Sequence, residues 1–383
     1  MTRRVRSVGL AALMAASLLP LATGAHAQTA AGGALLQSYT FDDPATVGLA
    51  EMQLTVLPFA VAVPFGDRIS ILASGAWARG MATGDEGAEI ELAGPTDTEV
   101  GIAIALGPDR MVLTAGASLP TGQSTHSTTE AVVASIVAAE LLPFGISSWG
   151  SGGGAGGDIA LAFASGAWGI GLSGGYRAAR EFEPLSDETF AYRPGDQIGV
   201  RLALDRDLSS GGTFSVLLGA QRFTEDQLSG ANLFRSGNRL EGVLTYAFPV
   251  GLAGSALIYG GAYHRANGTL LLDDPDLIGA ADSPAQQLFS GGVDLRLPLG
   301  RTAAFLPGVD GRVFRSEDGV GQGWVGTVGG SLEVILSGRR GRESIVLSPS
   351  ARYRMGHVIV EQDSETDLTG WEAGLVLSVG AGR

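Results

Sequence analysis

Residues 197–207 read QIGVRLALDRD, and this stretch decides the fold class. Its branched apolar side chains fall on every second residue, at Ile198, Val200, Leu202 and Leu204, while glycine, alanine, arginine or aspartate stands between them. Successive side chains of a β-strand point to opposite faces of the sheet. A period of two over eight or more residues therefore predicts a strand with one apolar and one polar face.

The same alternation recurs along most of the chain. Fifteen segments show it, and each is bounded by residues typical of turns: 51–64, 68–79, 97–106, 110–119, 157–165, 167–177, 197–207, 212–223, 238–248, 252–265, 286–298, 302–315, 322–336, 343–361 and 369–381. Many strands of this kind predict an all-β protein.

The connections between the segments alternate in length. Short ones are expected near 66–67, 108–109, 166, 209–210, 250–251, 299–300 and 339–340, and longer polar loops lie between them. Bacterial outer-membrane barrels have this layout, with short periplasmic turns and long extracellular loops. An even number of strands then requires one more strand before residue 51, and 34–41 is the only candidate. The chain is predicted to form a transmembrane antiparallel β-barrel of sixteen strands, or of fourteen if two segments are not strands.

A membrane crossing by helices is not supported. The most apolar stretch after the N-terminus, 131–144, is interrupted by Glu140 and is too short to span a bilayer. Only helices and closed barrels satisfy the backbone in lipid. A soluble β-sandwich or propeller is the alternative, but its core would be apolar, whereas the second face here carries mostly glycine, alanine, serine and scattered charge, as a water-filled lumen does.

The N-terminus has the form of a secretory signal. Arg3, Arg4 and Arg6 precede an apolar run over 8–21, and Ala25-His26-Ala27 provides a small-x-small cleavage pattern. We expect residues 1–27 to be a signal peptide and 28–383 to be one barrel domain, and a membrane-anchor helix is the alternative for the first segment.

The net charge and the expected location limit the partners of the mature chain. Loss of residues 1–27 removes three arginines and no acidic residue, so the formal net charge changes from −14 to −17. A nucleic-acid partner would require a basic surface and is not expected. The expected location is the cell outer membrane, and the expected partners are outer-membrane lipid, a small-molecule solute and the barrel-assembly machinery during insertion.

If the apolar faces meet lipid, the opposite faces line the lumen. Six arginines and seven acidic residues are placed there: Glu99, Arg201, Asp205, Arg239, Glu241, Asp294, Arg296, Asp310, Arg312, Glu333, Arg352, Arg354 and Glu372. Strong ion selectivity needs a cluster of one sign, and this set is balanced. Asp294 with Arg296 and Asp310 with Arg312 fall on adjacent predicted strands, so cross-strand ion pairs are expected between the two strands. These charges either stabilise the wall or line the path of a solute.

The long loop after residue 119 contains a predicted helix. Ser127-Thr128-Thr129-Glu130 has the form of a capping box, and apolar residues at helical spacing follow it: Val132, Val133, Ile136, Val137 and Leu141. We expect a helix from about Glu130 to Leu142, ended by Pro143. Its apolar face must be buried, either in the barrel mouth, where these residues would form a constriction, or on the barrel rim and lipid headgroups.

Signals for catalysis and metal binding are weak. The chain has no cysteine, and only His126, His264 and His357 lie outside the signal. Neither a G-x-S-x-G elbow nor an H-E-x-x-H motif occurs, and the acidic runs in the loops lack the spacing of a calcium loop. We therefore expect no enzyme, no catalytic residue, no metal site and no cofactor, with an outer-membrane hydrolase as an alternative.

Three short motifs carry a family resemblance. Residues 94–99, GPTDTE, are followed by a strand that ends in SLPTG at 118–122, and 192–196, YRPGD, leads into another strand. In these motifs and in its layout the chain resembles the channel family linked to the meta pathway of phenol degradation and, more distantly, the long-chain fatty-acid transporters. The resemblance implies passage of hydrophobic or aromatic small molecules. The chain departs from it in lacking an N-terminal plug sequence over 28–50 and a terminal aromatic residue.

The sequence thus predicts an outer-membrane channel or transporter for passive or gated uptake of small solutes, including hydrophobic or aromatic ones. A non-conducting structural or adhesion barrel is the second interpretation, and a hydrolase is the third.

Overall fold

The computed structural model describes residues 29–106, 111–251, 253–271, 283–337, 343–361 and 364–381. The predicted signal peptide at 1–27 lies outside these ranges, as do the expected short turns at 108–109 and 339–340.

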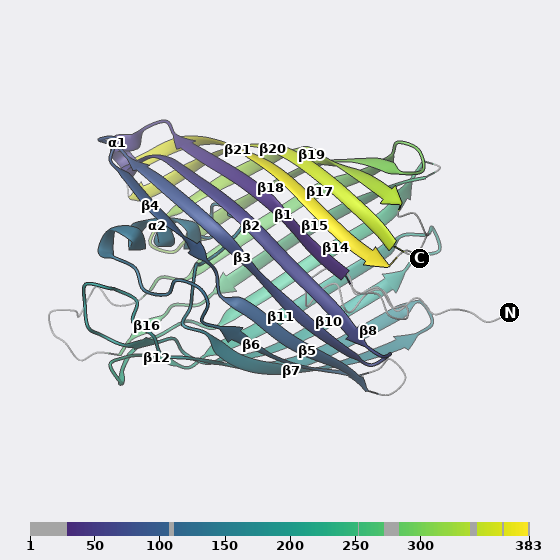
Figure 1. The fold of residues 1–383 in the computed structure, drawn as a ribbon, viewed down its shortest axis with the longest axis horizontal. Coiled ribbons are helices and arrows are strands. Elements are labelled where there is room, and N and C mark those ends of the chain that lie inside the picture. The colour runs from purple at the N-terminus through teal and green to yellow at the C-terminus, as the bar shows by residue number, and fades with distance from the viewer. Residues whose placement is uncertain are drawn as a thin grey trace.

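The described chain forms one closed barrel wall of sixteen antiparallel strands (Figure 1). These strands are β1 (Thr29–Phe41), β2 (Leu49–Phe65), β3 (Ile69–Gly84), β5 (Thr98–Leu106), β6 (Met111–Leu119), β7 (Gly154–Ser165), β8 (Trp168–Ala179), β10 (Gln197–Asp207), β11 (Thr213–Phe223), β14 (Arg239–Val250), β15 (Gly254–Arg265), β17 (Gln286–Pro298), β18 (Ala303–Ser316), β19 (Gln322–Ser337), β20 (Glu343–Glu361) and β21 (Ser364–Ala381). A further strand, β4 (Glu89–Pro95), precedes β5 and pairs with the far end of β3.

The barrel closes between its first and last strands. The β1–β21 pairing is antiparallel and runs from Ala30 opposite Val379 to Phe41 opposite Leu368. Each of the predicted segments coincides with a wall strand, including 34–41, which lies within β1. The strand count is therefore sixteen, and the alternative of fourteen is wrong.

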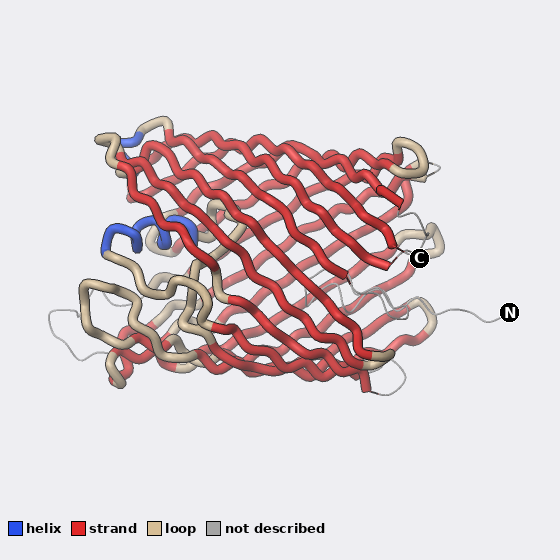
Figure 2. Tube along the Cα trace, viewed as in Figure 1, coloured by secondary structure: helices blue, strands red, loops and turns tan. Residues whose placement is uncertain are grey.

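The two ends of the barrel differ. At one end, which we call the short-turn end, strands are joined by tight connections such as those at Gly66 and Gly166, where φ is +69° and +62°. Glycine adopts this left-handed conformation without steric cost. The other end, the long-loop end, carries the helices and most of the loops (Figure 2). The general layout of outer-membrane barrels assigns the short-turn end to the periplasm.

The long-loop end also carries small elements that are not part of the barrel wall. They are two helices, α1 (Pro44–Val47) and α2 (Thr128–Ala138), and a second antiparallel sheet ordered β16-β13-β12-β9, formed by β9 (Tyr192–Arg193), β12 (Glu225–Leu228), β13 (Ala231–Arg235) and β16 (Thr269–Leu270). Only α2 is predicted from the sequence. Strands of two to five residues are too short for alternation to reveal them.

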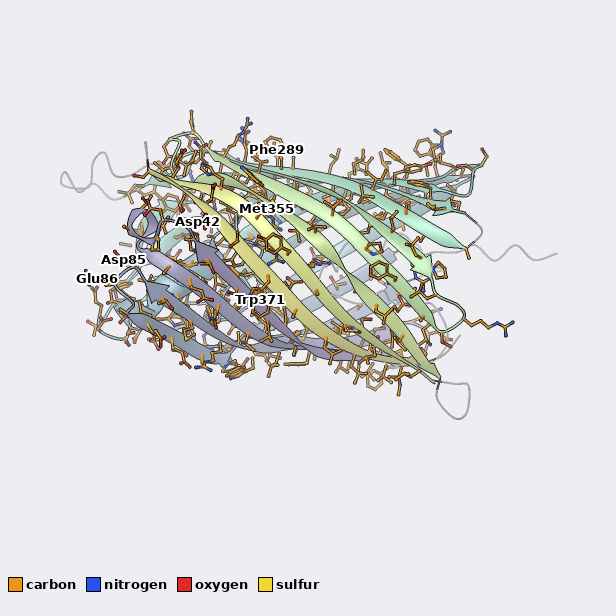
Figure 3. All side chains as sticks on the ribbon, turned by 90° about the horizontal axis from the view of Figure 1, so that it is seen from above. Asp42, Asp85, Glu86, Phe289, Met355 and Trp371 are labelled. Atoms are coloured by element: carbon orange, nitrogen blue, oxygen red, sulfur yellow. The ribbon has the colours of Figure 1, made fainter. Side chains whose placement is uncertain are left out.

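The outer face of the wall is apolar. Phe289, Met355 and Trp371 project from it in Figure 3, and Met355 and Trp371 are each about half exposed. Their neighbours in sequence, Arg354 beside Met355 and Glu372 beside Trp371, lie on the opposite face and are buried. An apolar outward band is what the hydrocarbon of a bilayer requires of a barrel. Among the residues that the structure describes, no helix is long and apolar enough to cross a membrane.

The sequence predicts a polar inner face, but part of the inner face is apolar. Near the long-loop end, β1, β2 and β3 turn apolar side chains inward, among them Tyr39, Met52, Leu54, Val56 and Ala78, all at most 1% exposed. These residues belong to one apolar cluster together with residues of the long loop after β6. The side chains are apolar because they contact this loop and not lumen water.

Candidate functional site

The connection between β6 and β7, residues 120–153, folds into the barrel, and we call it the inserted loop. Its helix α2 lies at the long-loop end against β3 and β4 (Figure 1). Beyond the helix the chain runs along the inner wall before it rises to β7. Of the two alternatives for the apolar face of the helix, burial inside the barrel is the one observed.

The helix begins as the sequence predicts. The Ser127 hydroxyl accepts a hydrogen bond from the Glu130 backbone N–H at 3.3 Å, and the Glu130 carboxylate accepts one from the Ser127 N–H at 2.7 Å. This capping box satisfies two backbone donors that a helix start leaves free. The hydrogen bond from the Ser127 N–H lowers the pKa of Glu130.

The helix ends earlier than expected, at Ala138 and not at Leu142. Ala139 is already extended, and the carbonyl oxygen of Glu140 accepts a hydrogen bond from Arg312 on the wall at 3.2 Å. The extended chain lets Leu141 and Leu142, which are adjacent in sequence, both be buried in the apolar cluster. These wall contacts outweigh continuation of the helix.

The predicted constriction residues divide into two groups. Val133, Val137 and Leu141 are at most 5% exposed, and Ile136 packs against the same cluster. Val132 lies on the other side of the helix and is 46% exposed.

A tryptophan joins the inserted loop to β3. Trp149 is 1% exposed, and its indole N–H donates to the Ala78 carbonyl oxygen at 3.2 Å. Gly80, one inward position further along β3, makes room for it, since a Cβ there would lie 2.9 Å from both the Trp149 ring and the Val133 side chain. Sequence reasoning missed Trp149, although a tryptophan in a Gly/Ser-rich loop is a signal for an anchoring contact.

Gln37 on β1 binds the innermost part of the inserted loop. Its side-chain amide donates to the Pro143 carbonyl oxygen at 2.9 Å and accepts from the Gly145 N–H at 2.7 Å. The amide also donates to the Glu372 carboxylate at 3.0 Å. A buried glutamine with these partners is satisfied on both its donor and acceptor sides.

Arg354 adds a charged contact at the same place. It is 3% exposed, pairs with Glu372, and donates to the Tyr39 hydroxyl and to the Pro143 carbonyl oxygen. Two of the predicted lumen arginines, Arg312 and Arg354, therefore hold backbone carbonyls of the inserted loop.

Two of the motifs that carry the family resemblance, GPTDTE and SLPTG, lie together at the root of the inserted loop. The Asp97 carboxylate accepts hydrogen bonds from the Gly122 N–H at 3.1 Å and from the Ser151 N–H at 2.8 Å. The Thr121 hydroxyl accepts from the Thr98 N–H at 2.9 Å. The GPTDTE and SLPTG segments thus bind each other and fix both ends of the loop.

The inserted loop also contacts the loop that follows β8. The His126 N–H donates to the Pro184 carbonyl oxygen at 3.0 Å, and the His126 carbonyl accepts from the Ser186 N–H at 2.8 Å. The imidazole is buried, and burial lowers the pKa of His126 while the nearby Glu130 carboxylate acts in the opposite direction. The Thr128 hydroxyl donates to Asp187 at 2.6 Å.

The rest of the inner wall carries exposed charge. Cross-strand register places the predicted lumen residues on the face opposite the exposed apolar side chains: Glu99, Arg201, Asp205, Arg239, Glu241, Asp294, Arg296, Asp310, Arg312, Glu333, Arg352, Arg354 and Glu372. Some of them form inner-face ion pairs, namely Arg201–Glu241 at 3.2 Å, Arg296–Glu333 at 2.8 Å and Glu99 with Arg177 at 3.3 Å. The side chains of Glu99 and Arg177 are 53% and 49% exposed, so the wall there faces solvent.

The expected cross-strand ion pairs between Asp294 or Arg296 on β17 and Asp310 or Arg312 on β18 do not form. Asp294 lies opposite Gly308 and Asp310 opposite Gly292, so neither aspartate faces an arginine of the other strand. Arg296 instead reaches Glu333 two strands away, and Arg312 reaches the inserted loop.

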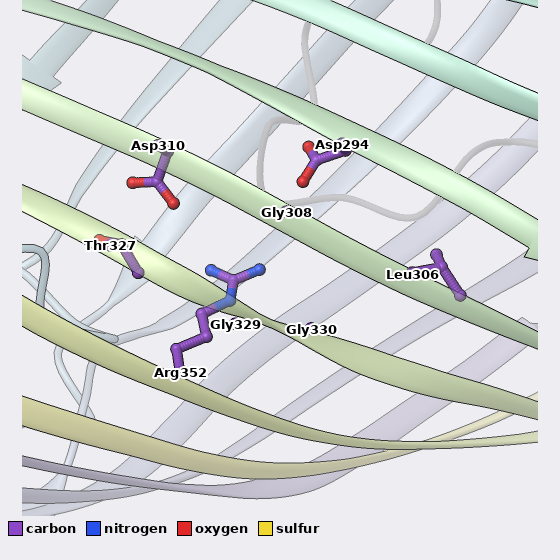
Figure 4. Close-up of a pocket in the computed structure, with 8 residues that line it drawn as sticks. All are labelled: Asp294, Leu306, Gly308, Asp310, Thr327, Gly329, Gly330 and Arg352. Carbon is purple, nitrogen blue, oxygen red and sulfur yellow. The ribbon is translucent and has the colours of Figure 1, made fainter.

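A recess opens in the wall between these charges (Figure 4). Asp294, Asp310, Thr327 and Arg352 border this shallow recess, which is open to the lumen. Its floor is backbone, because β18 and β19 carry glycine at 308 and 329.

A histidine meets two acidic side chains at the long-loop end of the barrel. The ring nitrogens of His357 contact Asp367 at 2.8 Å and Glu365 at 3.3 Å, and this group lies at the long-loop end of β20 and β21. Within the described ranges no group of three or more His, Cys, Asp or Glu residues could hold a metal ion.

Comparisons with known proteins give structural matches only. No family model matches the chain, and no curated protein matches it. It is similar in structure to an outer membrane channel of Pseudomonas putida (13% identity, 62% of this chain and 87% of that one, TM-score 0.39). It is also similar to the outer membrane channel DcaP of Acinetobacter baumannii (9% identity, 91% of this chain and 97% of that one, TM-score 0.40). A third similar structure is a loop-deletion mutant of OmpT, an outer membrane protein of Vibrio cholerae (10% identity, 92% of this chain and 99% of that one, TM-score 0.42).

The closed antiparallel wall and its apolar outer band define the class. The chain has the architecture of an outer-membrane β-barrel, with sixteen antiparallel strands closed into one wall.

Proposed function

We propose that this barrel is a channel for passive or gated uptake of small solutes across the outer membrane, narrowed by the inserted loop. One observation carries the proposal. The inserted loop packs on β1–β4 and on the long-loop ends of β18 and β19, while inner-face charges elsewhere, such as Glu99 and Arg177, remain about half exposed. A barrel filled by side chains, as a purely structural barrel would be, would bury these charges.

The two sides of the constriction suit solutes with an apolar part. The inserted loop presents Val132 outward from its helix, and the opposite wall presents paired charges and glycine backbone. Passage of hydrophobic or aromatic solutes, which the family resemblance implies, belongs to this proposal. Its partners are the solute, the lipid around the outer band and the barrel-assembly machinery during insertion.

Liposome swelling tests the proposal. Purified full-length protein is reconstituted into liposomes, which are diluted into solutions of uncharged sugars and of small aromatic acids, with protein-free liposomes as the control. Swelling that falls with solute size supports a channel. If swelling equals that of the control for every solute, the channel is refuted and a structural or adhesion barrel replaces it. Release of product from lipid or peptide substrates in the same samples would favour a hydrolase.

A further inference from the structure

The recess in the wall depends on two glycines on adjacent strands. Gly308 and Gly329 occupy inner-face positions on β18 and β19. A Cβ at 308 would overlap an Asp294 carboxylate oxygen, and one at 329 would meet the Arg352 side chain at 2.7 Å. Both charged side chains thus lie flat on the wall over positions that only glycine leaves free, and they border an open space instead of filling it.

The charges around the recess are incompletely paired. Among the described residues, no ion pair or hydrogen bond joins the carboxylate of Asp294 or Asp310 to another side chain. Arg352 is 45% exposed and reaches Glu372 only at 3.9 Å, while Glu372 already pairs with Arg354. Two carboxylates and one guanidinium therefore present free hydrogen-bonding capacity to the lumen.

The recess lies on the path beside the constriction. Asp310 and Arg352 each stand two residues along their strands from Arg312 and Arg354, which hold the inserted loop, and they lie on the side toward the short-turn end. A solute that passes the inserted loop meets the recess next. The recess is shallow and open to the lumen and encloses no space for a whole solute, so only one end group of a solute can contact its charges.

We propose that the recess binds the zwitterionic end of small solutes that carry an ammonium group beside a carboxylate, as free α-amino acids do. The ammonium group donates to Asp294 and Asp310, and the carboxylate accepts a forked pair of hydrogen bonds from Arg352, a geometry that guanidinium favours. The rest of the solute stays in the lumen. This inference rests on the proposed channel and names a solute class for it.

Saturation-transfer NMR on the full-length protein in deuterated detergent tests the assignment without any need for conduction. The probes are L-leucine, N-acetyl-L-leucine, which lacks the ammonium group, and L-leucinamide, which lacks the carboxylate. The variants are Asp294→Asn with Asp310→Asn, and Arg352→Gln. The matched control is Glu86→Gln, a carboxylate in the β3–β4 loop at the long-loop end (Figure 3). Heat-modifiable migration on gels verifies that each variant is a folded barrel.

We expect saturation of L-leucine in the parent and in Glu86→Gln, and apparent affinity lower by about tenfold or more in both recess variants, since each loses charged hydrogen bonds. Either modified leucine should bind less well than leucine. Equal saturation of all three probes, or unchanged affinity in the double aspartate variant, overturns the assignment. Liposome swelling without specific leucine binding would refute this inference and leave the channel standing, whereas specific binding without swelling would refute the channel alone.

Discussion

The indole N–H of Trp149 donates a hydrogen bond to the carbonyl oxygen of Ala78 at 3.2 Å, across 71 residues of sequence. This contact joins the inserted loop to the inner face of β3, and Trp149 is buried there with Val133 of the helix. The barrel wall is continuous without the inserted loop, so the barrel does not need contacts of this kind to form. The contacts set the width of the lumen.

Truncation of Trp149 should loosen the constriction. Trp149→Ala removes a fully buried ring, and substitutions of this size cost about 3–5 kcal/mol where the site cannot collapse. We expect larger and noisier single-channel currents in planar bilayers. Trp371→Ala, on the outer face of β21, is the matched control and should leave the currents unchanged. Currents equal to those of the parent in Trp149→Ala would show that the tryptophan does not hold the loop.

A methyl group at Gly80 should push the loop from the wall. In Gly80→Ala the Cβ would lie 2.9 Å from both the Trp149 ring and the Val133 side chain, so these must move. Hydrogen exchange of the amides in 128–150 should accelerate. Gly101→Ala is the control, because its nearest neighbour would be a carbonyl oxygen at an ordinary 3.5 Å. Equal exchange in the two variants would contradict the packing described here.

Loss of the capping box should weaken the helix and little else. Ser127→Ala removes the hydroxyl that accepts from the Glu130 N–H, and such losses cost about 1 kcal/mol. That corresponds to about fivefold faster exchange of the amides in α2. Ser135→Ala, at an exposed position within the same helix, serves as the comparison. Faster exchange throughout the barrel strands would indicate a global effect and count against this prediction.

Acid should release the contact at His126. Because burial lowers the pKa of His126 from its ordinary value of 6.5, the undocked loop binds the proton more readily than the docked loop. The stabilisation is complete above pH 6.5 and is lost as the pH falls through the lowered pKa. Protease cleavage within 120–153 should increase below pH 6.5 in the parent and less so in His126→Gln. The same pH profile in both proteins would rule out the histidine as the cause.

The barrel wall could be predicted from the sequence because the alternation of apolar and polar residues follows from the local geometry of a β-strand. Segments such as 197–207 show which residues face lipid. The alternation of short and long connections, together with an even strand number, predicted the first strand, β1. The small sheet of β9, β12, β13 and β16 could not be predicted, since its strands are set by contacts between loops.

The place of the inserted loop could not be decided from the helix alone, but β2 carried the missing signal. Its outward residues Leu57 and Phe59 are apolar, and so are its inward residues Leu54 and Val56. A strand apolar on both faces is buried on both. The recess could not be predicted, because it depends on the register that sets Gly308 opposite Asp294.

The central claim is that the inserted loop narrows a conducting lumen. The most direct measurement is planar-bilayer conductance of the purified barrel beside a variant that lacks residues 130–142, with heat-modifiable migration to verify that the variant is folded. We expect discrete single-channel steps from the parent and larger steps from the variant. Steps of equal size would contradict the role of the loop, and silence from both folded proteins would contradict the channel.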